Sequence, residues 1–153
     1  GGDKGKLSIF DQSFRTPIIF SWKNKIDKNT QFDDLIHTID ISATILDYAG
    51  MTNISQMGKS KSYKNVIKGL EEGSRNIVLG NSNKIRDEKD PMGRDVNAYW
   101  GRNKKWFFKS NITDGFEALY NISKDPYCNN NVIENHDNIA TLFRDKIRKK
   151  YLD

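Results

Sequence analysis

The sequence has few of the residues that build a self-contained reactive centre. Its 153 residues include one cysteine, Cys128, and two histidines, His37 and His136. A single cysteine excludes a disulfide within the chain and a cysteine-rich zinc site. Two histidines also provide few imidazole groups from which a metal site or a serine-histidine catalytic site could be built.

Long hydrophobic runs are missing as well. The apolar run at residues 17–20 is far shorter than the roughly 18 residues that cross a bilayer, so we expect no membrane span. The first six residues, GGDKGK, contain no initiator methionine, and no hydrophobic segment of the kind found in signal peptides follows them. These features predict that the chain is the interior or the tail of a longer protein.

The composition is typical of one folded domain with a strongly polar surface. Hydrophobic residues make up 36% of the chain and charged residues 29%, and the mean hydropathy is −0.75. The net charge of +5 would suit an anionic partner such as nucleic acid or a sulfated ligand. However, the basic residues are scattered or paired with acids, as in residues 84–90, which is typical of a solvated surface.

Two halves are visible, separated by a polar stretch at about residues 52–75. In the first half, the short apolar run within residues 16–22 predicts one buried strand. Over residues 34–48, apolar residues recur at three- and four-residue spacing, which predicts a helix that ends at Gly50.

The second half has the pattern of an antiparallel sheet followed by a helix. Apolar residues between Ile139 and Tyr151 share one helical face, and Asp137 or Asn138 is placed to cap the start of this helix. Strands are predicted at residues 76–80 and 117–122. Between them, residues 96–109 contain two aromatic segments around a Gly-Arg-Asn turn, which predicts a β-hairpin.

Several segments match a known order of motifs. Residues 5–17 read GKLSIFDQSFRTP, and four later segments follow in order: residues 38–50, 62–69, 98–107 and 119–132. Together they resemble the last third of the sulfatase family, within the alkaline phosphatase superfamily. Its first pattern here is G-K-x-S/T-x-Y/F-E/D-x-x-x-R-x-P. The sequence departs from the family at Ala43, where proline is usual, at Trp100, where arginine is usual, and at Cys128, where glutamate is usual.

The resemblance implies an α/β fold in two parts. Residues 1–70 would be the C-terminal end of a sulfatase-type α/β catalytic domain. Residues 71–153 would form a small antiparallel β-sheet with a packed C-terminal helix. The full-length protein would then be a sulfuric ester hydrolase, and because sulfatases are often exported, a periplasmic, secreted or lysosomal location is favoured without being fixed.

The resemblance also implies that most catalytic groups lie upstream of this chain. A formylglycine nucleophile made in a C/S-x-P-x-R motif, and the carboxylates that bind calcium, normally precede the segment that begins at Gly5. Cys128 cannot replace the nucleophile, because its neighbours lack the proline and arginine of that motif, and we expect it to be an ordinary thiol. We therefore expect the isolated chain to be inactive, and calcium to bind only in the full-length enzyme.

Lys6 is the one residue that matches a catalytic position of the family, where a lysine contacts a sulfate oxygen. An ammonium group is a compact charge with three rotatable donors, which suits this contact; the alternative is a solvated surface lysine. Asp11, Arg15 and Asp40 are assigned to structural support, and Asp11 and Arg15 could form an ion pair. His37 is expected to be partly buried or to cap a helix rather than to bind a metal.

Two other functions remain open. A noncatalytic basic module could bind a polyanion, either nucleic acid or a sulfated glycan, through hairpin aromatics such as Trp106 and the lysines beside them. We expect these aromatics to form the hairpin core instead, which argues against nucleic acid. A phosphoester hydrolase of the same superfamily would have a similar tail. The leading hypothesis implies two partners, a sulfate ester substrate and the upstream catalytic domain of the same protein.

Overall fold

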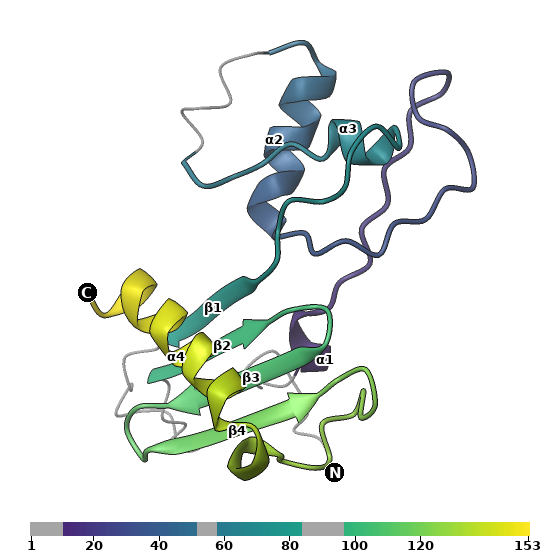
Figure 1. Ribbon diagram of the computed structural model, residues 1–153. Coiled ribbons are helices and arrows are strands. Elements are labelled where there is room, and N and C mark those ends of the chain that lie inside the picture. Colours follow the sequence, from purple (N-terminus) through teal and green to yellow (C-terminus); the bar gives the residue numbers. More distant parts are fainter. Residues whose placement is uncertain (1–10, 52–57, 84–96) are drawn as a thin grey trace, which may run out of the picture. The chain divides into compact units, whose positions relative to one another are not determined.

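The computed structural model describes residues 11–51, 58–83 and 97–153 of the chain (Figure 1). The chain divides into two compact units, one formed by Pro17–Val78 and the other by Gly1–Thr16 together with Leu79–Asp153. None of the helices in the described part has the length and hydrophobicity that crossing a bilayer requires. The predicted assignment of residues 1–70 to a catalytic domain concerns the full-length protein and stays a prediction.

A four-stranded sheet forms the centre of the unit that contains the C-terminus. The strands are hydrogen-bonded in chain order: β1 (Val78–Asn83), β2 (Asn97–Arg102), β3 (Trp106–Asn111) and β4 (Phe116–Asn121). β3 pairs antiparallel with both of its neighbours, so that Lys109 lies opposite Trp100 on one side and Ala118 on the other. The predicted antiparallel sheet and its hairpin are therefore confirmed. The predicted Gly-Arg-Asn turn is wrong in position, because Gly101 and Arg102 still belong to β2 and pair with β3, and the turn is formed by residues 103–105.

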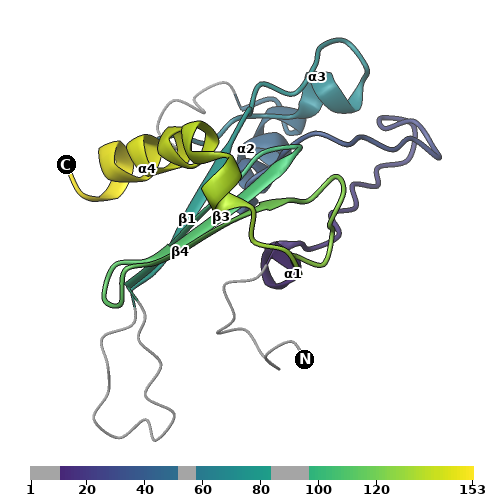
Figure 2. The same cartoon turned by 60° about the horizontal axis from the view of Figure 1, so that its bottom comes forward.

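One face of the sheet is covered by α4 (Asp137–Tyr151), as Figure 2 shows. The ring of Phe143 is fully buried and stacks on Phe108 of β3, with ring centroids 5.7 Å apart. A Cβ atom at Gly101 of β2 would lie 2.5 Å from Cδ1 of Phe143, so the helix packs closely because this position has no side chain. The predicted packing of the last helix on the sheet is therefore confirmed.

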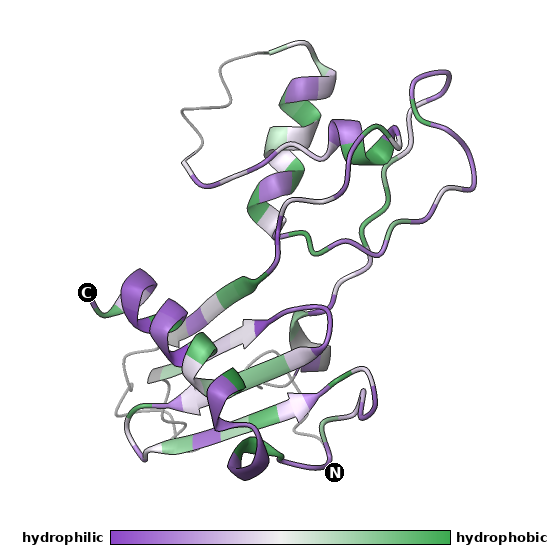
Figure 3. Ribbon diagram, viewed as in Figure 1, coloured by the Kyte–Doolittle hydropathy of each residue, from purple (hydrophilic) through white to green (hydrophobic). Residues whose placement is uncertain are grey.

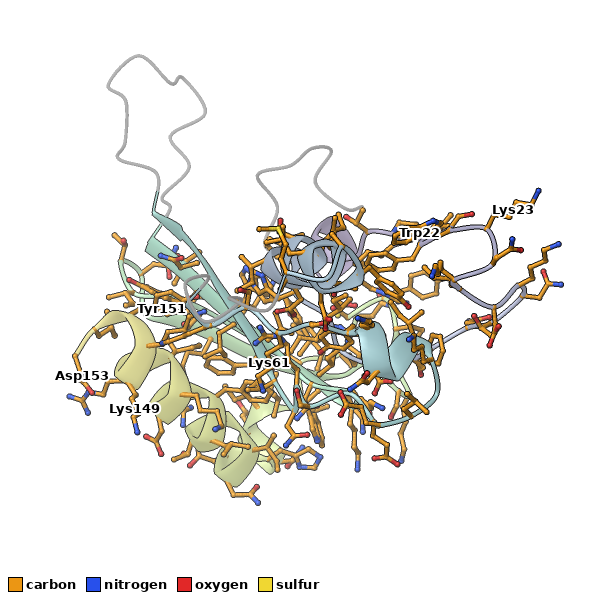
Figure 4. The ribbon with its side chains drawn as sticks, turned by 90° about the horizontal axis from the view of Figure 1, so that it is seen from above. Trp22, Lys23, Lys61, Lys149, Tyr151 and Asp153 are labelled. Carbon is orange, nitrogen blue, oxygen red and sulfur yellow. The ribbon has the colours of Figure 1, made fainter. Side chains whose placement is uncertain are left out.

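The two ends of α4 are fixed in different ways. At its C-terminal end, the hydroxyl of Tyr151 donates a hydrogen bond to the carbonyl oxygen of Leu79 at 3.1 Å. Lys149 is exposed near the same end, and α4 as a whole is mainly hydrophilic (Figures 3 and 4). At its N-terminal end, the capping position belongs to His136, so the predicted cap by Asp137 or Asn138 is wrong.

The reason is visible in the first turn of α4. Asp137 is already helical, and its carboxylate accepts a hydrogen bond from Arg144 at 2.8 Å instead of from the backbone of the helix start. The short 3-10 helix η2 (Ile133–Asn135) runs directly into His136, whose backbone therefore occupies the capping position. The side chain of His136 makes no capping hydrogen bond.

The Pro17–Val78 unit contains α2 (Thr38–Tyr48) and α3 (Lys64–Ile67). The predicted end of α2 is confirmed, because Gly50 follows the helix with a φ of +81°, a conformation that glycine adopts without strain. The start predicted at residue 34 is wrong: His37 caps the helix, its ring nitrogen accepting from the backbone N–H of Ile39. The predicted structural role of His37 is therefore confirmed.

The strand predicted within residues 16–22 is not formed. Residues 15–22 belong to no helix or strand, and the side chain of Ile19 is 87% exposed. Trp22 lies at the beginning of a turn, where its carbonyl oxygen accepts from the N–H groups of Lys25 and Ile26 (Figure 4). A strand requires a neighbouring strand for its backbone hydrogen bonds, and no strand in the described part of the chain pairs with these residues.

Candidate functional site

The candidate site begins with the segment that carries Lys6. Lys6 itself lies outside the described residues, so the structure does not test its predicted contact with sulfate. The description starts at Asp11, five residues later in the same motif, which is the first residue of α1 (Asp11–Phe14). The structure therefore shows how the end of this motif is held.

Arg102, the last residue of β2, holds the carboxylate of Asp11. Its Nε lies 2.6 Å from Oδ1 of Asp11, which is only 1% exposed. An ionised carboxylate that leaves water needs a charged or hydrogen-bonding partner, and Arg102 supplies both. These two residues are 91 positions apart in the sequence, so no local sequence pattern predicts their contact.

A second contact joins the same two elements. The ring of Phe14 stacks on the indole of Trp100, with centroids 4.2 Å apart and an interplanar angle of 23°. Gly101 faces α4, and side chains alternate along a strand, so Trp100 and Arg102 both project from the opposite face of β2. Figure 2 accordingly shows α1 on the side of the sheet away from α4.

The predicted ion pair between Asp11 and Arg15 is therefore replaced by a different one. Arg15 is exposed just beyond the end of α1, while the buried Asp11 turns towards the sheet. A guanidinium fixed at the end of a strand loses less conformational entropy on pairing than an exposed arginine in a segment without helix or strand structure. This difference explains why Arg102 is the partner of Asp11.

The sheet face below α1 is mostly apolar but contains one buried cation. Lys109 of β3 is only 6% exposed, and its ammonium lies 5.4 Å from the ring centroid of Phe116 and 5.5 Å from that of Tyr120. Both rings belong to β4, where they lie four residues apart on the same face of the strand, and they form cation-π contacts with Lys109. Sequence analysis counted Lys109 among the lysines beside the hairpin aromatics and did not predict its burial, although its two-residue spacing from the buried Phe107 places both on one face.

Cys128 packs into the apolar cluster on this face and is 6% exposed. Burial raises the pKa of its thiol to about 11, and the nearby carboxylates of Asp11 and Asp125 act in the same direction. Since the thiolate is the nucleophilic form, the burial and the raised pKa both disfavour reaction of this cysteine at neutral pH. Its position in the core fits the predicted ordinary thiol.

The hairpin aromatics are also core residues. Trp106 is 8% exposed, and Phe107 and Phe108 are fully buried. Stacking with an unpaired base would require an exposed ring face. These three rings are therefore not available to nucleic acid, as expected for a hairpin core.

Asp40 is the most highly connected carboxylate of the Pro17–Val78 unit. It is fully buried, and it accepts hydrogen bonds from the side chain of Arg75 and from the backbone N–H groups of His37 and Lys61. Burial by itself would raise the pKa of Asp40, but these hydrogen bonds together hold the pKa below its ordinary value. Arg75 is a second arginine that local sequence patterns did not reveal.

The described residues provide no metal centre. Across residues 11–51, 58–83 and 97–153, no three His, Cys, Asp or Glu side chains gather in a way that could hold a metal ion. Calcium binding by the full-length protein stays a prediction.

Comparison with known proteins extends over almost the whole chain. Residues 3–152 match the family described as N-sulphoglucosamine sulphohydrolase, C-terminal. The ulvan-active sulfatase of Formosa agariphila is 24% identical over 160 residues, an alignment that covers 89% of this chain and 32% of that protein.

Solved structures share the fold. BT4656, determined in complex with its substrate D-glucosamine-2-N,6-O-disulfate, superposes with a TM-score of 0.59 at 20% identity, over 74% of this chain and 24% of that one. BT1596, a 2-O GAG sulfatase, gives a TM-score of 0.54 at 19% identity, over 72% of this chain and 24% of that one. The chain thus spans about a third of the curated relative and about a quarter of these solved chains.

Proposed function

The chain belongs to the N-sulphoglucosamine sulphohydrolase C-terminal family, and on this basis we propose that the full-length protein hydrolyses a sulfate monoester on a saccharide. The family match over residues 3–152 is the observation that carries the proposal. It includes both the Gly5-Lys6 segment and the C-terminal sheet with its helix.

The proposed substrate class follows from what the relatives act on. One relative is named for ulvan, a second was determined with a disulfated glucosamine as its substrate, and a third is a 2-O GAG sulfatase. All three descriptions concern sulfated saccharides. A sulfated saccharide is therefore the first substrate class to test for this protein.

Lys6 is the catalytic contribution that we assign to this chain. During hydrolysis, negative charge shifts among the oxygens of the sulfuryl group, and a preorganised cationic donor stabilises that charge in the transition state. The ammonium of Lys6 would contact one of these oxygens. The nucleophile and any metal ligands would come from the rest of the protein.

The remainder of the first half would complete the catalytic domain. Within the Pro17–Val78 unit, the apolar side chains of Ile19 and Leu70 are 87% and 72% exposed. We propose that they pack against the upstream catalytic domain, which would remove their apolar surface from water.

The proposal is tested by incubating the full-length protein with D-glucosamine-2-N,6-O-disulfate and, separately, with glucosamine 6-phosphate. Release of inorganic sulfate from the first compound, with little phosphate from the second, is the expected result. Release of phosphate alone would establish the phosphoester hydrolase instead. Salt-sensitive binding of a sulfated glycan without any turnover would favour the noncatalytic module.

A further inference from the structure

We propose that Lys146, Lys149 and Lys150 of α4 form a surface that binds the sulfate groups of a polysaccharide chain. We call these three residues the α4 lysine surface. The surface follows from the contacts of α4, whereas the choice of a sulfated saccharide as its ligand rests on the proposed function.

The three lysines lie on one side of the helix. Lys149 and Lys150 follow Lys146 by three and four positions, and residues at these spacings are neighbours on a helix surface. All three side chains are exposed, and Figure 4 shows Lys149 near the C-terminal end of α4. Ile147 is 4% exposed and marks the side of α4 that faces the sheet. The α4 lysine surface therefore presents three cations within little more than one helical turn.

The arginines in the same half of α4 have carboxylate partners, whereas two of the lysines do not. Arg144 forms ion pairs with two carboxylates, and Arg148 forms one. Within the ranges that the structure describes, no carboxylate lies at ion-pair distance from Lys146 or Lys149, although Asp145 precedes Lys149 by four positions. Both ammonium groups are therefore open to an anion from outside the chain.

Lys150 is fixed in place at one end of the surface. Its Nζ donates a hydrogen bond to the carbonyl oxygen of Leu79 at 3.1 Å, and it lies 4.5 Å from the ring centroid of Tyr151. Both groups are neutral, so these two contacts hold the ammonium group without cancelling its charge. A side chain that is already ordered loses less conformational entropy when a ligand binds.

The helix macrodipole explains only part of this arrangement. It favours cations within the last turn, where Arg148, Lys149 and Lys150 lie. Lys146 precedes that turn, and like charges four positions apart on a helix repel each other. The α4 lysine surface is thus electrostatically unfavourable by itself, and a bound anion relieves the repulsion.

A sulfated polysaccharide fits these charges. It repeats sulfate groups along one chain, so several weak contacts with exposed ammonium groups act together. An ammonium group has three rotatable donors, so it can meet sulfate oxygens in more than one orientation. Single-stranded nucleic acid fits less well, because base stacking requires exposed rings and the hairpin aromatics Trp106, Phe107 and Phe108 are buried.

The test measures binding of the full-length protein to heparin, a sulfated polysaccharide, over a range of salt concentrations. The variant Lys146→Gln/Lys149→Gln removes two charges and leaves the contact between Lys150 and Leu79 in place. The variant Lys146→Arg/Lys149→Arg keeps both charges. Lys23→Gln/Lys25→Gln is the matched control, because it removes two exposed lysines from the Pro17–Val78 unit and changes the net charge equally. Desulfated heparin and a single-stranded DNA oligonucleotide are the comparison ligands.

We expect Lys146→Gln/Lys149→Gln to raise the Kd for heparin by about 3-fold to 30-fold at low salt, because each exposed contact is weak. The dependence of its affinity on salt should also become less steep, since fewer counterions are released on binding. The arginine variant and the Lys23→Gln/Lys25→Gln control should bind heparin like wild type. Desulfated heparin and the oligonucleotide should bind more weakly than heparin to the wild-type protein.

Three results would overturn the inference. The first is a Kd for Lys146→Gln/Lys149→Gln equal to that of wild type. The second is an equal loss in the Lys23→Gln/Lys25→Gln control, which would show that only net charge matters. The third is binding of desulfated heparin or of the oligonucleotide as tight as that of heparin, which would show that sulfate is not the recognised group.

Failure of the inference and failure of the proposed function give different results. If the protein binds heparin through these lysines but releases no sulfate from D-glucosamine-2-N,6-O-disulfate, the proposed function fails and the inference stands. If the protein releases sulfate while Lys146→Gln/Lys149→Gln binds heparin like wild type, the proposed function stands and the inference fails.

Discussion

Arg75 donates hydrogen bonds to both carboxylate oxygens of Asp40, with Nε 2.5 Å from Oδ2 and Nη2 2.5 Å from Oδ1. The two residues lie 35 positions apart and both belong to the Pro17–Val78 unit. Because Asp40 also accepts the backbone N–H groups of His37 and Lys61, one side chain joins the start of α2 to two later segments. A bidentate pair of this kind adds geometric specificity as well as stability.

Replacing Asp40 should destabilise the chain strongly. Asp40→Ala leaves Arg75 without its carboxylate partner and removes the acceptor of two backbone N–H groups, so we expect a loss of about 3–5 kcal/mol in unfolding free energy. Guanidinium unfolding measures this loss. Asp137→Ala is the control, because its carboxylate is 73% exposed and its pair with Arg144 should contribute less than about 1 kcal/mol. Equal losses for the two variants would contradict the importance of the buried pair.

The lowered pKa of Asp40 predicts loss of stability in acid. Because the folded chain binds the proton of Asp40 more weakly than the unfolded chain, ionised Asp40 stabilises the fold above the ordinary pKa of 3.8. This contribution is lost as the pH falls through the lowered pKa of the folded state. Urea unfolding between neutral and strongly acidic pH should therefore show a smaller loss in Asp40→Ala than in wild type. The same loss in both proteins would rule out Asp40 as a source of the acid sensitivity.

Gly101 is predicted to be intolerant of a side chain. A Cβ atom there would lie 2.5 Å from Cδ1 of Phe143 and 2.9 Å from Cδ2 of Leu79, so Gly101→Ala should cost about 1–3 kcal/mol. On a Phe143→Ala background, the same substitution should cost less, because the obstructing ring is absent. A double-mutant cycle by thermal unfolding measures the difference. An identical cost on both backgrounds would show that the ring is not the obstacle.

Cys128 should react slowly with thiol reagents in the folded chain. Its pKa of about 11 leaves very little thiolate at neutral pH, and the side chain is 6% exposed. We expect Ellman's reagent to modify it much faster after unfolding in guanidinium chloride than before. A native rate equal to the unfolded rate would show that the thiol is accessible, contrary to its position in the core.

The features that sequence patterns predicted are those determined by near neighbours along the chain. The end of α2 follows from Gly50, which takes the left-handed conformation. The β2–β3 hairpin follows from two aromatic segments around the turn that Asn103 closes by accepting two backbone N–H groups. The packing of α4 follows from the spacing of residues such as Phe143 and Ile147, which are both buried.

The features that the patterns missed depend on distant residues. The pairs Arg75 with Asp40 and Arg102 with Asp11 bridge 35 and 91 positions, and no local spacing indicates which arginine meets which carboxylate. The strand predicted within residues 16–22 failed for a related reason, since its formation depends on a neighbouring strand. The start of α2 was placed too early, since the helix begins at Thr38 after its cap His37, and the cap of α4 was misplaced because His136, which is not among the common capping residues, occupies that position.

Steady-state kinetics of the full-length Lys6→Ala variant, with Lys4→Ala as the control, test most directly whether this chain supplies a sulfate-contacting donor. Lys6→Ala should lower kcat/KM for a sulfated saccharide by about 10²-fold to 10³-fold, or about 3–4 kcal/mol, as expected for the loss of one preorganised donor. Lys4→Ala should leave kcat/KM close to that of wild type. If both variants turn over at near-wild-type rates, Lys6 is a surface lysine and does not contact the sulfate group.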